Sequence, residues 1–209
     1  MLAIGPVPVR GEDKTFPPGD ANGFRMYAEK APNARGVRRV LEAIGGSGSV
    51  QSYEQLLKTL GHGTGASDVG VVLLTGNYPS AWATDELTGA LGGKFVTLID
   101  TLGSSVMDAS GVVLPGATWM EKSGSFENAR NMIQHFEQAI PVIEMAKSEG
   151  QIAMDLAAHR EGKRAAAYNA AETRRAMAAA HATLSVFITD VSMPMTGSLA
   201  EADMQVVEL

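Results

Sequence analysis

The sequence predicts an α/β fold with a doubly wound, mostly parallel sheet, an extended N-terminal arm and a helical C-terminal region. Apolar strand-like runs alternate with helical patterns in the centre of the chain, and this alternation is typical of right-handed parallel crossovers. The chain has 209 residues, of which 45% are hydrophobic. That is enough for one good-sized domain or two small ones with a buried core.

The first 34 residues predict an extended arm, because they contain five prolines and four glycines. Proline fixes φ and removes a backbone hydrogen-bond donor, so it disfavours regular elements. We expect Phe24, Met26 and Tyr27 to attach this arm to a surface of the protein.

Helical apolar spacing predicts a helix over 35–44, which ends at two glycines. The following segment 45–49 reads Gly-Gly-Ser-Gly-Ser and predicts a flexible turn. A phosphate-binding loop is the alternative, but a dinucleotide fingerprint follows a strand and keeps a different glycine spacing. A short helix is predicted over 50–60.

The centre of the chain predicts three strands, at 69–74, 95–99 and 112–115. The first is a continuous apolar run, so we expect it to be buried on both faces of a parallel sheet. Helices are predicted between these strands, over 81–91 and 104–109. The order strand, helix, strand, short helix, strand favours the doubly wound architecture.

Beyond the third strand the pattern changes. A polar, glycine-containing loop is expected over 117–128. Helices are predicted over 143–160 and, from its high alanine content, over 164–184. A final strand is predicted over 184–188, followed by a tail.

Composition excludes several functions. The chain has no cysteine, so it cannot hold a disulfide, a thiolate zinc site, a cysteine nucleophile or a cysteine-ligated iron–sulfur cluster. The net charge of -6 disfavours nucleic acid as a partner. No apolar run approaches the roughly 20 residues that cross a bilayer, and the N-terminus lacks the basic start of a signal peptide. We therefore expect a cytoplasmic protein without direct membrane insertion, held at the membrane periphery only through a complex.

No catalytic residue and no metal site is predicted. The four histidines are too far apart in sequence to form a metal-binding pair, and lie at positions 62, 135, 159 and 181. No G-x-S-x-G nucleophile elbow occurs. The acidic residues are scattered, and their spacing marks no carboxylate pair.

The best candidate site lies where the first two central strands end. Ligands of open parallel sheets bind beyond the carboxyl ends of the strands, where loops present backbone donors and short polar side chains. The candidate binding residues are Gly76 and Asn77 in the first loop, and Asp100, Thr101, Ser104 and Ser105 in the second. Asp100 is suited to accept hydrogen bonds from a guanine or a ribose. The alternative is structural: Asn77 closes a turn and Ser104 serves the short helix.

At these residues the sequence resembles the molybdopterin oxidoreductase family, which includes formate dehydrogenases, nitrate reductases and the G subunit of NADH-quinone oxidoreductase. Residues 71–79 are similar to the family's strand with a "GxNP" turn, and 97–101 to its next strand, which ends in Asp. Residues 109–128 are similar to the signature "ADVVLPxATxxEKxGTFxN". The similarity covers about 65–160.

The resemblance implies a Rossmann-like domain that helps to hold one guanosine arm of molybdopterin guanine dinucleotide. It places the α/β domain at 35–163, between the arm at 1–34 and an Ala-rich helix and tail at 164–209. The family's cluster-bearing module and metal ligand lie outside the matched region. We expect no cofactor in the chain alone.

Two departures favour one branch of the family. The usual Thr-Glu-Thr of the second loop is Gly-Ser-Ser at 103–105, and Glu-Asn-Ala-Arg at 127–130 replaces the usual "TNTEGR". By the resemblance, both changes would thin out the contacts to the cofactor. They indicate the G-type branch of NADH-quinone oxidoreductase, which generally carries no molybdenum in this domain.

Three functions therefore remain open. The first is a fragment or truncated homologue of a G-type subunit, mainly structural, whose partners are the other subunits or the cluster-bearing domain of an oxidoreductase complex. The second is a dinucleotide-binding module of a formate dehydrogenase-like enzyme. The third is a stand-alone interaction protein on a reused fold.

Overall fold

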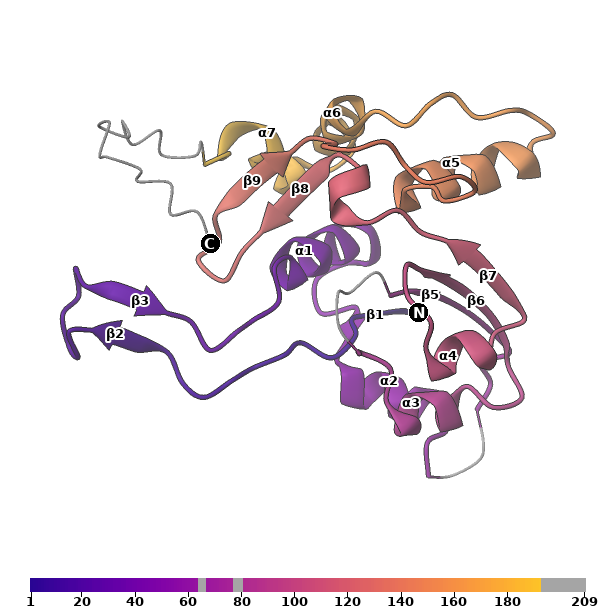
Figure 1. Cartoon of the computed structure of the whole chain (residues 1–209), viewed down its shortest axis with the longest axis horizontal. Helices are drawn as coiled ribbons and strands as arrows, with labels where there is room; N and C mark the ends of the chain where they lie inside the picture. The colour runs from indigo at the N-terminus through magenta and orange to yellow at the C-terminus, as the bar shows by residue number, and fades with distance from the viewer. Residues whose placement is uncertain (64–66, 77–80, 193–209) are drawn as a thin grey trace, which may run out of the picture.

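A three-stranded parallel sheet is the largest sheet among the described residues and lies at the right in Figure 1. The structure is a computed structural model, and it describes residues 1–63, 67–76 and 81–192. The strands lie in the order β5 (Val71–Thr75), β6 (Phe95–Asp100) and β7 (Val112–Pro115). β6 pairs in parallel with both neighbours. The α/β fold is thus confirmed, with parallel strands joined through helices.

Three short helices cover one face of this sheet: α2 (Tyr53–Thr59), α3 (Asp85–Ala90) and α4 (Ser105–Asp108). Their apolar residues pack with alternate strand residues into the main core. The buried members are Leu56, Leu60, Val72, Leu87, Ala90, Leu91, Val96, Leu98 and Val106. α3 begins four residues later than expected, because Thr84 caps it by accepting from the backbone N–H of Leu87.

The opposite face of the sheet is apolar and partly open. Val71 is 71% exposed, and Leu73, Phe95 and Val112 are exposed as well. Since Val71 pairs with Phe95 and alternate residues share a side, these four side chains lie on one face. We call them the open face. The expectation that the first strand is buried on both sides is therefore wrong: β5 is an edge strand with one side uncovered.

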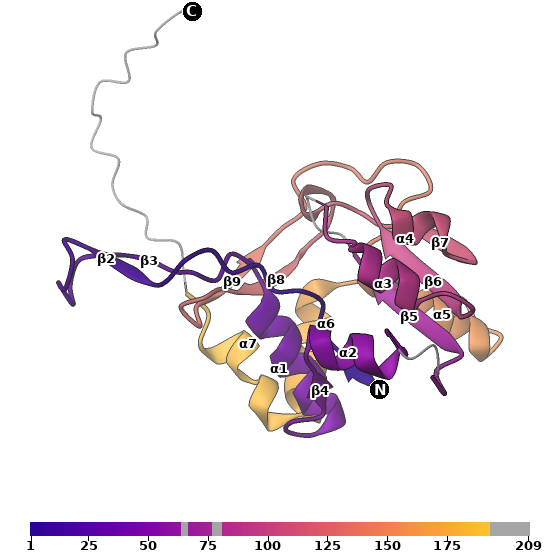
Figure 2. The ribbon, with the colours of Figure 1, turned by 90° about the horizontal axis from the view of Figure 1, so that it is seen from below.

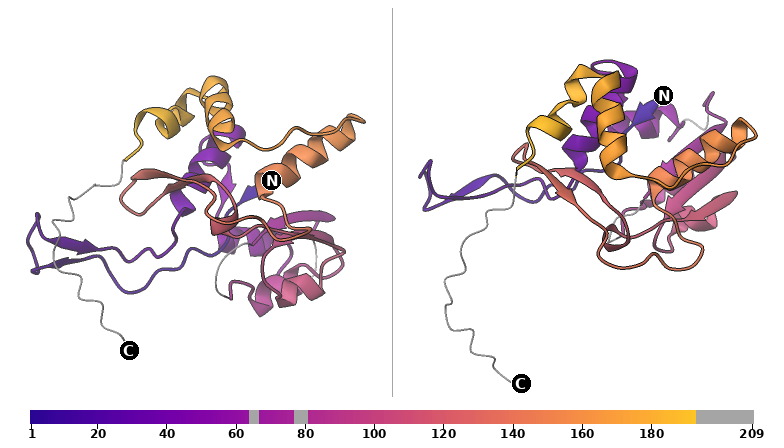
Figure 3. Two further views of the ribbon diagram at one scale, coloured as in Figure 1. Left: turned by 45° about the horizontal axis from the view of Figure 1, so that its top comes forward. Right: turned by 90° about the horizontal axis from the view of Figure 1, so that it is seen from above.

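Helix α5 (Glu149–Arg160) lies on the side of the sheet opposite to α3 and α4 (Figures 2 and 3). The four side chains of the open face nevertheless remain exposed. At the carboxyl end of the same face Ile99 is only 3% exposed, whereas Thr75 of the edge strand β5, its register partner, is exposed. α5 begins later than the expected residue 143, because Ser148 caps it.

A second, smaller core lies beside the sheet. The antiparallel hairpin of β8 (Gly124–Glu127) and β9 (Ile133–Phe136) packs against α1 (Ala34–Gly45), α6 (Ala170–Ala180) and the 3₁₀ helix η2 (Ala182–Leu184), which leads into α7 (Val186–Thr189). Its buried residues are Ile133, Leu184 and Phe187, joined by Val40, Ala43, Met177, Val186 and Val191.

Two expectations for this region are wrong. The expected loop over 117–128 contains the 3₁₀ helix η1 (Trp119–Glu121) and strand β8, which gains its partner only from β9. The expected strand over 184–188 is helical. Its residues Leu184 and Phe187 lie three apart and are both buried, whereas Ile188 is exposed, a helical and not an alternating pattern.

The N-terminal arm carries short strands. β1 (Leu2–Ala3) pairs in parallel with β4 (Val50–Gln51), which precedes α2 in the segment expected to be wholly helical. The turn between α1 and β4 matches the turn expected at 45–49, with positive φ at Gly46 and Gly48. β2 (Lys14–Phe16) and β3 (Phe24–Met26) form a hairpin that projects from the body (Figure 2).

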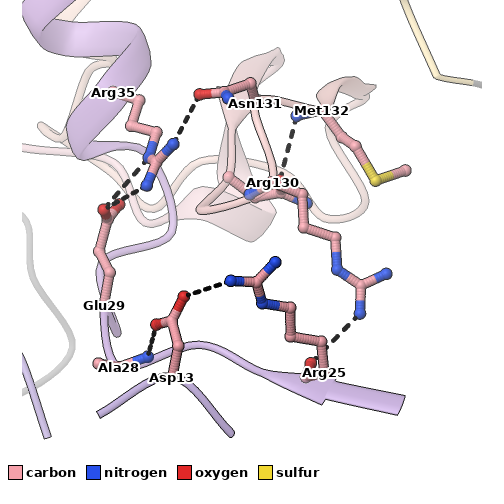
Figure 4. A network of polar contacts seen from close by, with 9 residues as sticks. Asp13, Arg25, Ala28, Glu29, Arg35, Arg130, Asn131 and Met132 are labelled. Atoms are coloured by element: carbon pink, nitrogen blue, oxygen red, sulfur yellow. Dashed lines mark hydrogen bonds and ion pairs between the residues drawn. The ribbon is translucent and has the colours of Figure 1, made fainter. Parts of the chain in front are cut away.

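Polar contacts attach the arm to the body (Figure 4). Arg35, in the first turn of α1, donates to Glu29 of the arm at 3.2 Å and to Asn131 at 2.7 Å. The guanidinium groups of Arg25 and Arg130 lie 5.2 and 5.6 Å from the ring centroid of Tyr27. Phe24 and Met26 remain exposed, so of the three residues expected to attach the arm only Tyr27 does so.

No helix in the described ranges is long and apolar enough to cross a membrane.

Candidate functional site

The carboxyl ends of β5 and β6 bring two of the expected site residues together. Gly76 donates its backbone N–H to the carbonyl of Ile99 at 2.9 Å, which places it beside Asp100. A Cβ on Gly76 would lie 2.1 Å from Asp100 Oδ2, so only glycine allows this approach. Asn77, the other expected residue of this loop, lies outside the described residues.

Both oxygens of the Asp100 carboxylate accept hydrogen bonds from the protein itself. The side chain is at the buried end of β6, and the residue is 6% exposed. Oδ1 accepts from the backbone N–H of Thr101 at 2.7 Å. Oδ2 accepts from the indole Nε1–H of Trp82 at 2.9 Å. The group expected to recognise a base or a ribose is thus bonded within the chain.

The two serines of the second loop stabilise helices. Ser104 caps α4, because its Oγ accepts from the backbone N–H of Met107 at 3.3 Å. Ser105 Oγ lies 2.9 Å from Thr88 Oγ1, and this hydrogen bond joins α4 to α3. Ser104 therefore has the role that the structural alternative assigned to it.

A small cavity of about 230 Å³ lies next to these residues and is lined by Trp82, its neighbours and the loop of Leu102 to Ser105. Pockets for drug-sized ligands typically measure about 300–1,000 Å³. The Asp100 carboxylate and the hydroxyls of Ser104 and Ser105 already have partners within the chain. Among the described residues, these partners and the small cavity fit a guanosine arm at Asp100 poorly.

Sequence reasoning missed Trp82. A half-buried indole needs an acceptor for its N–H, and Trp82 lies in the loop between β5 and α3, close to the expected strand-end site. A tryptophan close to the expected site was therefore a usable signal for a residue of that site. It did not identify Asp100 as the acceptor of the indole N–H.

Two buried carboxylates were also missed. Glu121 accepts from the backbone and the hydroxyl of Thr118, both at 2.8 Å, and from the backbone of Ile143 at 3.1 Å. These hydrogen bonds, from the Thr118 backbone first, lower the pKa of Glu121. The Thr-x-x-Glu spacing of a capping box was the signal.

The second carboxylate, Glu127, is 1% exposed and pairs with Arg39 at 2.8 Å. Its hydrogen bond, the largest cause, raises the pKa of the Arg39 guanidinium. The partners are 88 residues apart, so no local pattern could have revealed them.

A larger cavity of about 540 Å³ lies between the η1 segment, the start of α5 and the start of α6. Two of its charged lining residues form ion pairs, since Lys122 contacts Glu149 at 2.7 Å and Lys147 contacts Asp155 at 2.6 Å. The two lining glutamates, Glu121 and Glu137, accept hydrogen bonds within the chain. Within the described residues, no three His, Asp or Glu side chains gather as a metal site would require.

Comparison with known protein families identifies the family to which the chain is similar. The family model of the molybdopterin oxidoreductases matches residues 18–159, well over half of the 209 residues. The match begins in the hairpin of the arm and ends within α5. It includes β5 to β7 and the strand-end residues. No curated protein matches the chain.

Proposed function

Because the chain belongs to the molybdopterin oxidoreductase family, we propose that it is a structural part of an oxidoreductase complex, in a G-type subunit of the NADH-quinone oxidoreductase kind. Electron transfer would be the work of its partners, since a chain without cysteine cannot hold a cysteine-ligated cluster. The departures from the family signature at 103–105 and 127–130 support this branch.

The open face is the observation that carries the proposal. Parallel sheets are normally covered on both faces, yet Val71, Leu73, Phe95 and Val112 are exposed on one side. On the same face Ile99 of β6 is buried, whereas Thr75 of the edge strand β5 is exposed. Covering the exposed part would complete the second layer of the doubly wound architecture.

The open face favours an apolar partner surface. Its four side chains carry no charge, so burial would be driven by the hydrophobic effect without fixed directional contacts. Fully burying one such side chain contributes roughly 1.5–3 kcal/mol, and four of them support a specific contact. We propose that a helix of the cluster-bearing domain or of a neighbouring subunit packs here.

The competing proposal is a dinucleotide-binding module of a formate dehydrogenase-like enzyme. It needs an Asp100 carboxylate that can accept from a ligand and a cavity that admits a nucleotide. The Trp82 contact and the cavity of about 230 Å³ favour the structural function over this one.

The test is assembly in the cells that make the protein. The full chain, tagged and purified from those cells, is expected to elute with partners that show iron–sulfur absorbance. Leu73→Lys places a charge in the open face at an exposed position and is expected to lose these partners. Ile44→Lys, at the exposed end of α1, is the matched control and is expected to keep them.

The two other outcomes contradict the proposal. If Leu73→Lys keeps the cluster-bearing partners, the open face is not the contact. If the purified chain reduces an acceptor from NADH or formate without any partner, the structural function itself is wrong. Circular dichroism of both variants checks that they are folded.

A further inference from the structure

We propose that Trp82 is the specificity-determining residue of the strand-end site: its indole fills the place at which a purine would contact Asp100 and keeps nucleotides out. The starting observation is the hydrogen bond from the indole Nε1–H to Asp100 Oδ2 at 2.9 Å. The indole is a planar bicyclic ring with an edge N–H donor, as guanine is, although it donates one hydrogen bond to the carboxylate where a guanine edge offers two.

The surroundings hold the indole in this position. A Cβ built on Gly76 would lie 2.7 Å from Cζ2 of Trp82 and 2.1 Å from Asp100 Oδ2. The backbone at the end of β5 therefore packs closely against both partners of the hydrogen bond. Thr101 fixes the other carboxylate oxygen, so the carboxylate is oriented from two sides.

A ligand would have to displace the indole at a cost. The hydrogen bond involves a buried carboxylate at 6% exposure, and hydrogen bonds to charged groups are stronger than those between neutral groups. An entering base would regain a similar contact but would first have to move the ring. The protein's own indole is already in place and loses no translational freedom on contact.

Removing the ring would open the site. Trp82 also lines the cavity of about 230 Å³ next to Asp100. Truncation to alanine would join the space of the indole to this cavity and remove the indole's hydrogen bond from Asp100 Oδ2 at the end of a parallel strand. A carboxylate accepts the paired N1–H and N2–H donors of guanine, whereas the corresponding edge of adenine offers an acceptor at N1. The opened site should therefore prefer guanine.

The test is calorimetric titration of the full chain with GMP and with AMP. The wild-type protein is expected to give no binding heat at millimolar GMP. Trp82→Ala is expected to bind GMP, with an affinity at least tenfold above that for AMP. The double variant Trp82→Ala/Asp100→Asn is expected to lose this binding, because the amide no longer accepts at both positions.

Three results would overturn the proposal. These are GMP binding by the wild type as tight as by Trp82→Ala, a folded Trp82→Ala that binds no GMP, and GMP binding that persists without the Asp100 carboxylate. If Trp82→Ala does not fold, Trp119→Phe leaves Trp82 as the sole tryptophan in the otherwise native chain. Its emission is then expected to stay constant up to millimolar GMP, and a GMP-dependent change would refute the closed site.

The inference rests on the proposed function in one respect: both take the strand-end site to bind no cofactor. The two can fail separately, because loss of partners in the Leu73 variant reports on the open face, whereas GMP titration reports only on Asp100 and Trp82.

Discussion

The guanidinium of Arg39 on α1 donates two hydrogen bonds to the carboxylate of Glu127 on β8, from Nε to Oε2 at 2.8 Å and from Nη2 to Oε1 at 2.5 Å. The backbone N–H of Glu127 in turn donates to Asn33 Oδ1 at 2.8 Å, at the start of the same helix. These contacts join α1 to the β8–β9 hairpin. The carboxylate is 1% exposed, so hydrogen bonds from such partners must offset the free energy that it loses by leaving water.

Replacing Arg39 by methionine is expected to lower the free energy of unfolding by about 2 kcal/mol. Breaking a fully buried pair costs roughly 3–5 kcal/mol, and the smaller value applies because the Arg39 side chain is 36% exposed and partly screened. Arg38→Met is the control on the same helix. Its 3.9 Å contact with Glu42 is exposed, so this substitution should change the free energy of unfolding by less than about 0.5 kcal/mol. Equal losses of unfolding free energy for Arg39→Met and Arg38→Met, measured by urea unfolding, would show that the buried pair stabilises the protein no more than the exposed one.

Glu121→Gln is expected to make stability less sensitive to acid. Hydrogen bonds from Thr118 and Ile143 lower the pKa of Glu121 in the folded protein. The unfolded chain therefore binds the proton first, at the ordinary pKa of about 4.3. The contribution is present above that value and is lost as the pH falls through the folded pKa.

Urea unfolding measured between about pH 6 and 3 checks this linkage. The wild type should lose stability more steeply below about pH 5 than Glu121→Gln. Parallel curves for the two proteins would show that the Glu121 carboxylate does not contribute.

Leu184→Ala is expected to destabilise the protein by about 2–5 kcal/mol, the range for large-to-small changes in a core. Leu184 is 1% exposed and belongs to the second core. Ile188→Ala, only four residues later, is expected to be nearly neutral because Ile188 is exposed. The helical course buries Leu184 and Phe187 together, whereas a strand would place these two residues, three apart, on opposite faces. Similar losses in urea unfolding for Leu184→Ala and Ile188→Ala would contradict this burial pattern.

Gly76→Ala is expected to destabilise the strand-end site, because the new Cβ would overlap Asp100 Oδ2 and approach Trp82. Overpacking of this kind costs about 1–3 kcal/mol. Gly70→Ala just before β5 is the matched control, since nothing lies within 4 Å of its Cβ position. Urea unfolding followed by tryptophan fluorescence compares the two. Unchanged stability and emission in Gly76→Ala would refute the close packing.

The sequence predicted elements whose signals are local. The strands at β6 and β7 and the helix α1 were found because apolar spacing, glycine and proline mark them without reference to the rest of the chain. The meeting of Gly76 and Asp100 followed from a topological rule, since parallel strands place their carboxyl ends at one edge.

Elements that depend on distant partners were not predictable. β8 is a strand because β9 pairs with it, and α7 is helical because Leu184 and Phe187 share a core with α1 and β9. The exposure of Val71 could not be read from an apolar run, because composition does not say which side of a strand lacks a neighbour. At the site, the contact between Trp82 and Asp100 joins a residue before α3 to the last residue of β6, 18 positions later. No local pattern specifies such a contact.

Hydroxyl-radical footprinting of Phe95 tests the central claim most directly. Phe95 belongs to the open face and is exposed in the chain alone. In the complex purified from the cells that make the protein, we expect Phe95 to be strongly protected from oxidation while Ile44, exposed on α1, reacts as before. Equal oxidation of Phe95 in the isolated chain and in the complex would show that the open face is not where this protein joins its oxidoreductase partners.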